Sequence, residues 1–326
     1  MMIRSKHHVG QGSPGDGTVQ TRYGALTFKD GRPTDESADR LAQMLLFGRA
    51  VEIYQQHLPA VSMFQFRQGL ARSGVSGNGQ VVIWKALLDA GSAARVGRAE
   101  SVFACSFLDL KRDGPIVIDA PPGIHGVLDD MWMRFVADVG AAGPDGGRGG
   151  RYLVLAPNHD GAVPEGHFVV RSPTFGIWML LNPADQEPID AVRRFRSLRI
   201  HPLAQSANPP AMEFLNRSDG PIDTNAPSDF SFFEQLGQLV EQESAEAVSP
   251  LERFYLTQIG MHFGRRFAAD ETMQSLLAEA ALVGMATMQA QAPALVAPAA
   301  VSPTQGHGEW QRMFQTGDAF SSEVGA

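Results

Sequence analysis

Short apolar runs closed by turn residues dominate the middle of the chain. Three of them, each ended by Pro, Gly, Asn or Asp, are Tyr152–Ala156, Gly166–Arg171 and Phe175–Leu181. The same rhythm starts upstream, in Val102–Leu110, Pro115–Ala120 and Met131–Val139. Runs of this length separated by turn residues are typical of antiparallel strands. The pattern therefore predicts a small β-sandwich domain over residues 97–203.

Before the sandwich, apolar residues recur at the spacing of a helix. Leu41, Leu45, Val51, Tyr54 and Leu58 fall near one face, which predicts a helix over Ser37–Leu58 that ends at Pro59. Residues 34–96 are therefore interpreted as a helical segment. Within it, Val81–Trp84 is equally compatible with a strand and with the first turn of a helix, because short apolar runs carry no decisive period.

After the sandwich, helical spacing returns in residues 204–290. Phe232, Phe233 and Leu236 follow a cap at Ser228 or Asp229, Ser249–Pro250 begins a second helix, and a third is expected over Ala269–Ala290. A short helix over Ile189–Leu198 closes the sandwich region. Residues 1–33, rich in Gly, Pro and polar residues, are expected to be disordered, and residues 291–326 to be a linker and lead-in to a further domain. The fold class predicted is α+β.

Composition limits the classes of partner. The 326-residue chain is 44% apolar and 19% charged, with a formal net charge of −8, which argues against nucleic acid and anionic membrane as main partners. Its single cysteine, Cys105, excludes an intramolecular disulfide. The sequence contains neither an apolar run of about 20 residues nor an apolar signal region, so we expect a soluble, cytoplasmic protein.

One stretch has the residue types of a small-ligand surface. Asp130, Trp132, Arg134 and Asp138 would share one face of a strand by period two. Such a face can bind a sugar or another small polar ligand through stacking and carboxylate hydrogen bonds. The alternative is an Asp–Arg pair on an exposed sheet face beside a half-buried Trp.

Other candidate chemistry is weaker. His125, His159, Asp160 and His167 offer metal-ligand side chains, but without the spacing of a ligand motif. Gly10–Gly15 has dinucleotide-fingerprint spacing but lacks the strand and helix that the motif needs. Cys105 lies in an apolar strand pattern, which favours an inert buried thiol. The sequence therefore predicts no cofactor, no metal and no catalytic residue.

Longer stretches resemble a known family. The runs DAPPGIHGVLDDMWMRFVADVG, GRYLVLAPNHDGAVPEGHFVVRSPTFGIWMLL and LRIHPLAQSANPPAMEF are similar to the bacterial family catalogued as domain of unknown function 1254. The resemblance extends over roughly Ser37 to Ala290. It implies an immunoglobulin-like β-sandwich packed beside a helical domain that is built from segments on both sides of it. Family members usually continue into a jelly-roll domain, number 1214 in the same catalogue; Trp310–Phe314 resembles its lead-in, and the rest is expected to be missing.

Two departures from the family pattern bear on function. Members commonly carry a Pro-Asn-Asn-Asp-Thr-like segment where this chain has Gly97–Ser101, and an arginine where it has Asn182. Two classes of function stay open: a non-catalytic sandwich module that binds a partner domain, a second copy or a polar ligand, and an unrecognised hydrolase with a pocket between sandwich and helices. The altered polar segment, and the lack of a recognisable nucleophile–base pair, favour the binding module.

Overall fold

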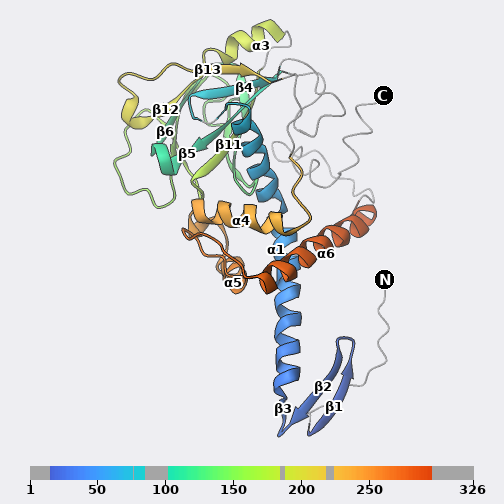
Figure 1. Ribbon diagram of the computed structural model, residues 1–326. Helices are drawn as coiled ribbons and strands as arrows, with labels where there is room; N and C mark the ends of the chain where they lie inside the picture. The colour runs from blue at the N-terminus through green and yellow to red at the C-terminus, as the bar shows by residue number, and fades with distance from the viewer. Residues whose placement is uncertain (1–14, 76, 85–101, 184–187, 218–223, 296–326) are drawn as a thin grey trace.

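The computed structural model describes residues 15–75, 77–84, 102–183, 188–217 and 224–295, and it shows an α+β fold (Figure 1). The larger sheet has the strand order β13-β4-β5-β11-β7-β8. Its strands are β4 (Gln80–Trp84), β5 (Phe103–Asp109), β7 (Ile124–Asp130), β8 (Phe135–Val139), β11 (Gly176–Pro183) and β13 (Glu213–Asn216). The assignment of Gln80–Trp84 to a strand resolves the ambiguity that its sequence leaves.

A second sheet packs against the first. Its order is β10-β9-β6-β12, formed by β6 (Ile116–Ala120), β9 (Gly150–Leu155), β10 (Phe168–Arg171) and β12 (Arg199–Pro202). Pairing in both sheets is antiparallel except for β9 with β10 and β4 with β13. Strands therefore occur in all six of the apolar runs expected to form them, but the run Met131–Val139 is a strand only from Phe135, and the antiparallel pairing expected is wrong for β9 with β10. Strand β13 lies in a Pro- and Asn-rich stretch that gives no strand signal.

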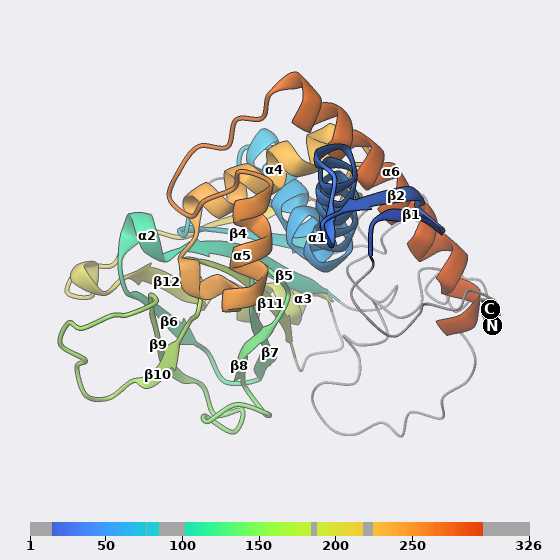
Figure 2. The same cartoon turned by 90° about the horizontal axis from the view of Figure 1, so that it is seen from below.

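Strand β11 shows how the larger sheet separates two cores. Ile177 and Met179 belong to the apolar cluster shared with the second sheet, whereas Trp178 belongs to the cluster shared with the helices. Successive side chains of a strand point to opposite faces, so a strand buried on both sides reads as a continuous apolar run. The three layers are therefore the smaller sheet, the larger sheet and the helices (Figure 2).

The helical layer combines elements from before and after the sandwich. Helix α1 (Asp35–Arg72) contacts α4 (Phe230–Gln242), α5 (Pro250–Gln258) and α6 (Glu271–Leu295). Shorter elements are the helices α2 (Leu110–Asp113) and α3 (Pro188–Phe195) and the 3₁₀ turns η1 (Leu203–Gln205) and η2 (Ala245–Ala247). This packing of helices from both sides agrees with the arrangement that the family resemblance implies.

The expected end of the first helix at Pro59 is wrong. Helix α1 continues through Pro59 to Arg72, a span of about 57 Å at 1.5 Å per residue. An interior proline costs about 3 kcal/mol. The residues that follow it, Ala60, Val61, Met63 and Phe64, are buried in the helical core. Burial of each large apolar side chain contributes roughly 1.5–3 kcal/mol, which offsets the proline.

The expectation of disorder over residues 1–33 is also wrong for its described part. Strands β1 (Gly17–Thr21), β2 (Gly24–Lys29) and β3 (Arg32–Pro33) form an antiparallel sheet beside the first turns of α1. Thr34 caps α1, and the hydroxyl of buried Ser37 accepts a hydrogen bond from the amide of Thr27 at 2.9 Å. This contact fixes the small sheet to the helix. Residues 1–14 and 296–326 lie outside the described residues.

Candidate functional site

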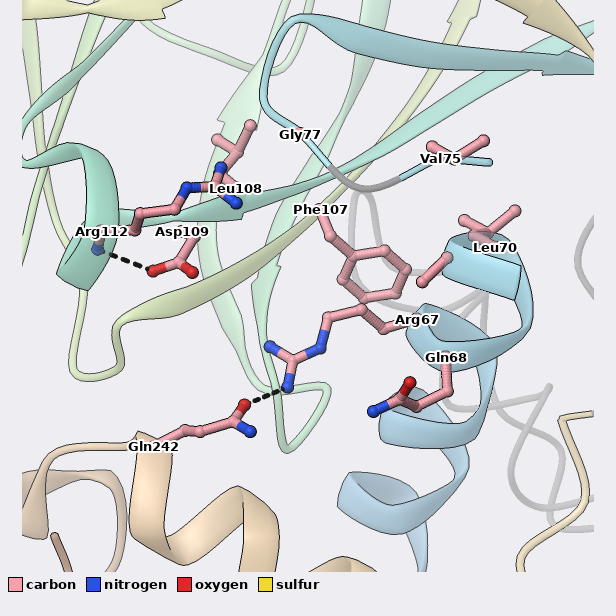
Figure 3. Close-up of a pocket in the computed structure, with 11 residues that line it drawn as sticks. Arg67, Gln68, Leu70, Val75, Gly77, Phe107, Leu108, Asp109, Arg112 and Gln242 are labelled. Atoms are coloured by element: carbon pink, nitrogen blue, oxygen red, sulfur yellow. Dashed lines mark hydrogen bonds between the residues drawn. The ribbon is translucent and has the colours of Figure 1, made fainter. Parts of the chain in front are cut away.

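A polar cleft lies where the sandwich meets the helical layer. It consists of two adjoining cavities of about 230 and 180 Å³ that share Arg67, Asp109, Arg112 and Gln242 in their walls. The side chains come from α1, from the end of β5, from α2 and from the end of α4 (Figure 3). We treat the two cavities as one site because the same charged side chains line both.

Arg67 projects into the cleft from the last turns of α1, beside Phe107 (Figure 3). Its Nη2 donates a hydrogen bond to Oε1 of Gln242 at 2.6 Å, and its guanidinium lies 5.3 Å from the ring centre of Phe64. Burial lowers the pKa of Arg67, and the negative charges of Glu243 and Asp109 oppose that effect. The pKa of an arginine is so high that the side chain stays charged.

Asp109 ends β5 and begins α2. Its Oδ1 accepts hydrogen bonds from the amides of Lys111 and Arg112 at 3.1 and 3.0 Å, as an N-cap residue does. The cap turns the chain sharply, so that Lys111 and Arg112 also line the cleft. Lys111 donates to the carbonyl of Gln242 at 3.0 Å, and Arg112 pairs with Asp113 at 2.6 Å.

Glu243 closes the cleft at the end of α4. Its side chain is buried, and its two carboxylate oxygens accept the amides of Phe175 and Gly176 at 2.6 and 2.8 Å. Burial raises its pKa to about 7, although those two hydrogen bonds and Arg67 lower it. Glu243 therefore ties the end of α4 to the start of β11, and its raised pKa makes it easier to protonate than an exposed glutamate.

The four residues predicted to form a ligand surface do not share one strand face in the structure. The strand ends at Asp130, residues 131–134 form a turn, and β8 begins only at Phe135, so period two does not place the four residues on one strand face. Met133 occupies the turn with φ 57°. Asp130 instead accepts the amides of Trp132 and Arg134 at 2.7 and 3.0 Å and pairs with the Arg134 guanidinium at 2.7 Å.

The β7–β8 turn is anchored to the helices. Nε1 of Trp132 donates to Nδ1 of His57 in α1 at 2.8 Å, and Arg134 donates to the carbonyl of Ala247. Trp132 is 7% exposed and Asp130 fully buried, whereas Asp138 lies further along β8. Three of the four predicted residues are thus brought together, at a contact between sandwich and helices. Contact of these residues with a ligand stays a prediction.

His57 is the least expected member of this contact. It is 1% exposed, and burial lowers its pKa to about 4. Because Nδ1 accepts the tryptophan N–H, the neutral ring carries its proton on Nε2, for which no partner lies among the described residues. Its position in the apolar helical pattern Tyr54–Leu58 gives no sequence signal for this role.

The remaining sequence candidates lie elsewhere. In the described part of the chain, no group of three or more His, Cys, Asp or Glu side chains is placed to hold a metal ion. Cys105 is buried in β5, and burial raises its pKa, as expected of an inert thiol. Asn182 lies in β11 opposite His125 of β7, and Gly97–Ser101 falls outside the described residues. None of the helices that the structure describes is both long and apolar enough to cross a membrane.

Sequence reasoning missed the cleft. Arg67, Asp109 and Glu243 are ordinary charged residues far apart in the chain, and no motif links them. The one local signal is the N-cap at Asp109, which predicts a helix start but no binding site. Their assembly depends on the packing of α1 and α4 against the larger sheet, which no short motif encodes.

Comparisons with known proteins show a similarity to one family over the central region and point to no activity. Residues 79–202 match a family model described as protein of unknown function (DUF1254), which confirms the resemblance over the central region. No curated protein matches the chain. Among solved structures, the VPA0106 protein from Vibrio parahaemolyticus is similar, with 16% identity and a TM-score of 0.51 over 75% of this chain. The match covers 60% of that chain, and it supports similarity of fold alone.

Proposed function

We propose that the protein is a non-catalytic binding module that holds a small polar ligand in the cleft between sandwich and helices. One observation carries this proposal: Arg67 presents a charged guanidinium to the cleft with one hydrogen bond, to a neutral amide, among the described residues. A guanidinium has five N–H donors in a planar fork. The guanidinium forms part of the wall of a cavity of about 230 Å³, where its remaining donors are available to a ligand.

The composition of the cleft supports binding over catalysis. Its described lining contains no Ser, Cys or His side chain that would serve as a nucleophile or base. The acidic side chains are engaged: Glu243 holds two backbone amides, and Asp109 caps α2. A side chain that already fixes the backbone is poorly placed to take part in a reaction.

A hydrolase is the second candidate, and one observation favours it. Two carboxyl groups, Asp109 and Glu243, line the same cavity, and the pKa of Glu243 is raised to about 7. Glycoside hydrolases commonly use two carboxyl groups, one as a general acid with a raised pKa and the other as an ionised carboxylate. Hydrolysis of chromogenic glycosides or esters that is abolished in Glu243→Gln would favour this candidate over the binding module.

Ligand-observed NMR with a library of small polar fragments tests the proposed function. We expect a subset of fragments to bind wild-type protein and to lose binding in Arg67→Gln. Arg72→Gln is the matched control, because Arg72 lies on the same helix, is exposed and does not line the cleft. Fragments that bind wild type, Arg67→Gln and Arg72→Gln equally would place the ligand elsewhere and contradict the proposal.

Two further predictions belong to the same proposal. The immunoglobulin-like description of the two packed sheets rests on the family resemblance, and the α+β layering is compatible with it. Self-association, or binding of a partner domain, is the other mode of action considered for the module. Light scattering over a range of protein concentrations tests it, and a strict monomer would leave the cleft as the binding site.

A further inference from the structure

Resting on the proposed function, we propose that the ligand of the cleft is a small monocarboxylic acid with an apolar tail. Its carboxylate pairs with the Arg67 guanidinium, and its tail lies against the apolar wall of the larger cavity. Three features of the cleft favour such a ligand: the hydrogen-bonding and charged groups that line it, the position of its apolar side chains, and its size.

The hydrogen-bonding groups that the cleft leaves available to a ligand are mainly N–H donors. Both oxygens of Glu243 accept backbone amides, and Oδ1 of Asp109 accepts two more. Arg67 donates to the neutral Gln242 alone among the described residues. A cationic ligand would therefore compete with backbone amides for three of the four carboxylate oxygens, whereas an anion finds the fork of an arginine, which matches a carboxylate in two parallel hydrogen bonds.

Charge favours the same sign of ligand. The lining contains three cationic side chains, Arg67, Lys111 and Arg112, and two acidic ones, Asp109 and Glu243; the charge of Arg112 is offset by its ion pair with Asp113, which leaves two of each sign. Partial protonation of Glu243 near neutral pH makes the balance more positive. Because Arg67 is partly shielded from solvent, its attraction for an anion is stronger than that of a surface arginine.

Apolar side chains on one wall of the larger cavity would contact the apolar tail of the ligand. Leu70 and Val75, both nearly fully buried, and the half-buried Phe107 line the larger cavity on the side away from Gln242 (Figure 3). Phe107 itself packs edge-on against Phe66, with ring centres 5.6 Å apart, so its position is fixed. A ligand bound to Arg67 thus places its next few carbons beside a rigid aromatic ring.

The cavity volume limits the ligand. The larger of the two cavities, which contains the apolar wall, is about 230 Å³, below the range of roughly 300–1,000 Å³ that drug-sized ligands occupy, so the tail that enters it must be small. Phenylacetate, a compact aromatic acid, is therefore a suitable probe. Phenylacetamide keeps its shape without the charge, and phenethylamine reverses the charge. For so small a compound we expect a dissociation constant on the order of a millimolar.

Isothermal titration of these three probes into the full chain tests the ligand class. We expect phenylacetate to bind at least about 10-fold more tightly than phenylacetamide, and phenethylamine to bind more weakly still, because a hydrogen-bonded charge pair contributes that much. Arg67→Gln should weaken phenylacetate about 10- to 100-fold. Arg67→Lys should recover part of the loss, and Arg72→Gln should leave binding unchanged. Circular dichroism confirms that each variant is folded.

The outcomes separate this inference from the proposed function. Equal or tighter binding of the amide or the amine, with dependence on Arg67, overturns the carboxylic-acid class and leaves the cleft as a binding site. Binding of phenylacetate that is equally strong in Arg67→Gln overturns the pairing with Arg67. If none of the three probes binds while the polar fragments described above do, the ligand class is wrong. If neither set binds, the proposed function fails with it.

Discussion

Replacement of Asp129 by asparagine is expected to stabilise the protein increasingly as the pH rises from about 4 to about 7, and to the full extent above that pH. Asp129 is the penultimate residue of β7, next to the register shift between β7 and β8, and is 4% exposed. Burial, and then the charges of Asp130 and Asp138, raise its pKa from the ordinary 3.8 to about 7. Asparagine has nearly the same shape without the charge.

The size of the effect follows from this pKa. A rise from 3.8 to about 7 corresponds to roughly 4 kcal/mol, at 1.36 kcal/mol per pKa unit. Because the folded-state pKa of Asp129 lies above its unfolded value, the folded protein holds the proton longer. Its contribution to stability is fully present below about pH 4 and is lost as the pH rises through about 7. The new amide must find hydrogen-bond partners, which costs about 1–3 kcal/mol if it fails.

We therefore expect Asp129→Asn to raise the unfolding free energy by about 1–3 kcal/mol at about pH 8, and to leave it unchanged or lower at about pH 4. Thermal melts at the two pH values measure the difference, since about 1 kcal/mol moves the midpoint by about 1–2 °C in a chain of this size. Asp39→Asn, at an exposed position of α1, is the control and should show no pH-dependent change. The same melting shift for Asp129→Asn at both pH values would refute the reasoning.

Three further predictions concern stability. Gly140→Ala should lower the unfolding free energy measured in urea by about 3 kcal/mol or more, because Gly140 has φ 87° and a Cβ there would overlap the carbonyl oxygen of Ile124. Gly114→Ala, at φ 70° and with open space around the Cβ, should lower it by only about 1 kcal/mol, and equal losses in the two variants would contradict the steric argument. Ser249→Ala, which removes the cap of α5, should cost about 1 kcal/mol, and an unchanged melting midpoint would argue against the capping box. Because burial lowers the pKa of His57 to about 4, the unfolded state binds the proton first, and the unfolding free energy should fall by up to roughly 3 kcal/mol as the pH falls from about 6.5 to 4. His57→Gln should remove that part of the acid sensitivity, and an unchanged dependence of stability on pH in this variant would refute the prediction.

The sandwich strands were predictable because their signal is local. In Gly149–Leu181 each strand is a short apolar run and each boundary is a Pro, Gly, Asn or Asp, so β9, β10 and β11 lie close to where the sequence places them. The caps of α4 and α5, at Asp229 and Ser249, are equally local. Such features depend on a few neighbouring residues, so they can be predicted without knowledge of the tertiary structure.

The errors occurred where packing overrides a local rule. Pro59 should end a helix, yet burial of the following turn keeps α1 continuous. The turn after Asp130 has Met133, not a glycine, at positive φ, so the sequence does not mark the end of the strand there. The two-residue alternation was therefore wrongly extended from Asp130 through the turn to Asp138. The cleft is the extreme case, because Arg67, Asp109 and Glu243 meet only after the sheet and helices have packed.

The order in which the helices occur along the chain has a consequence for synthesis on the ribosome. α1 emerges first and the sandwich strands next, whereas α4 to α6 are released only with the last of the described residues. Until then, α1 is the one long helix of the described chain that is available to pack on the helix-facing side of the larger sheet, where Trp84, Phe103 and Trp178 lie. The nascent chain therefore carries an apolar surface from the synthesis of the larger sheet until that of α4, and such a surface is bound by chaperones and aggregates when it stays exposed. A stop codon between β13 and α4 should yield an insoluble product, although both sheets are encoded in full.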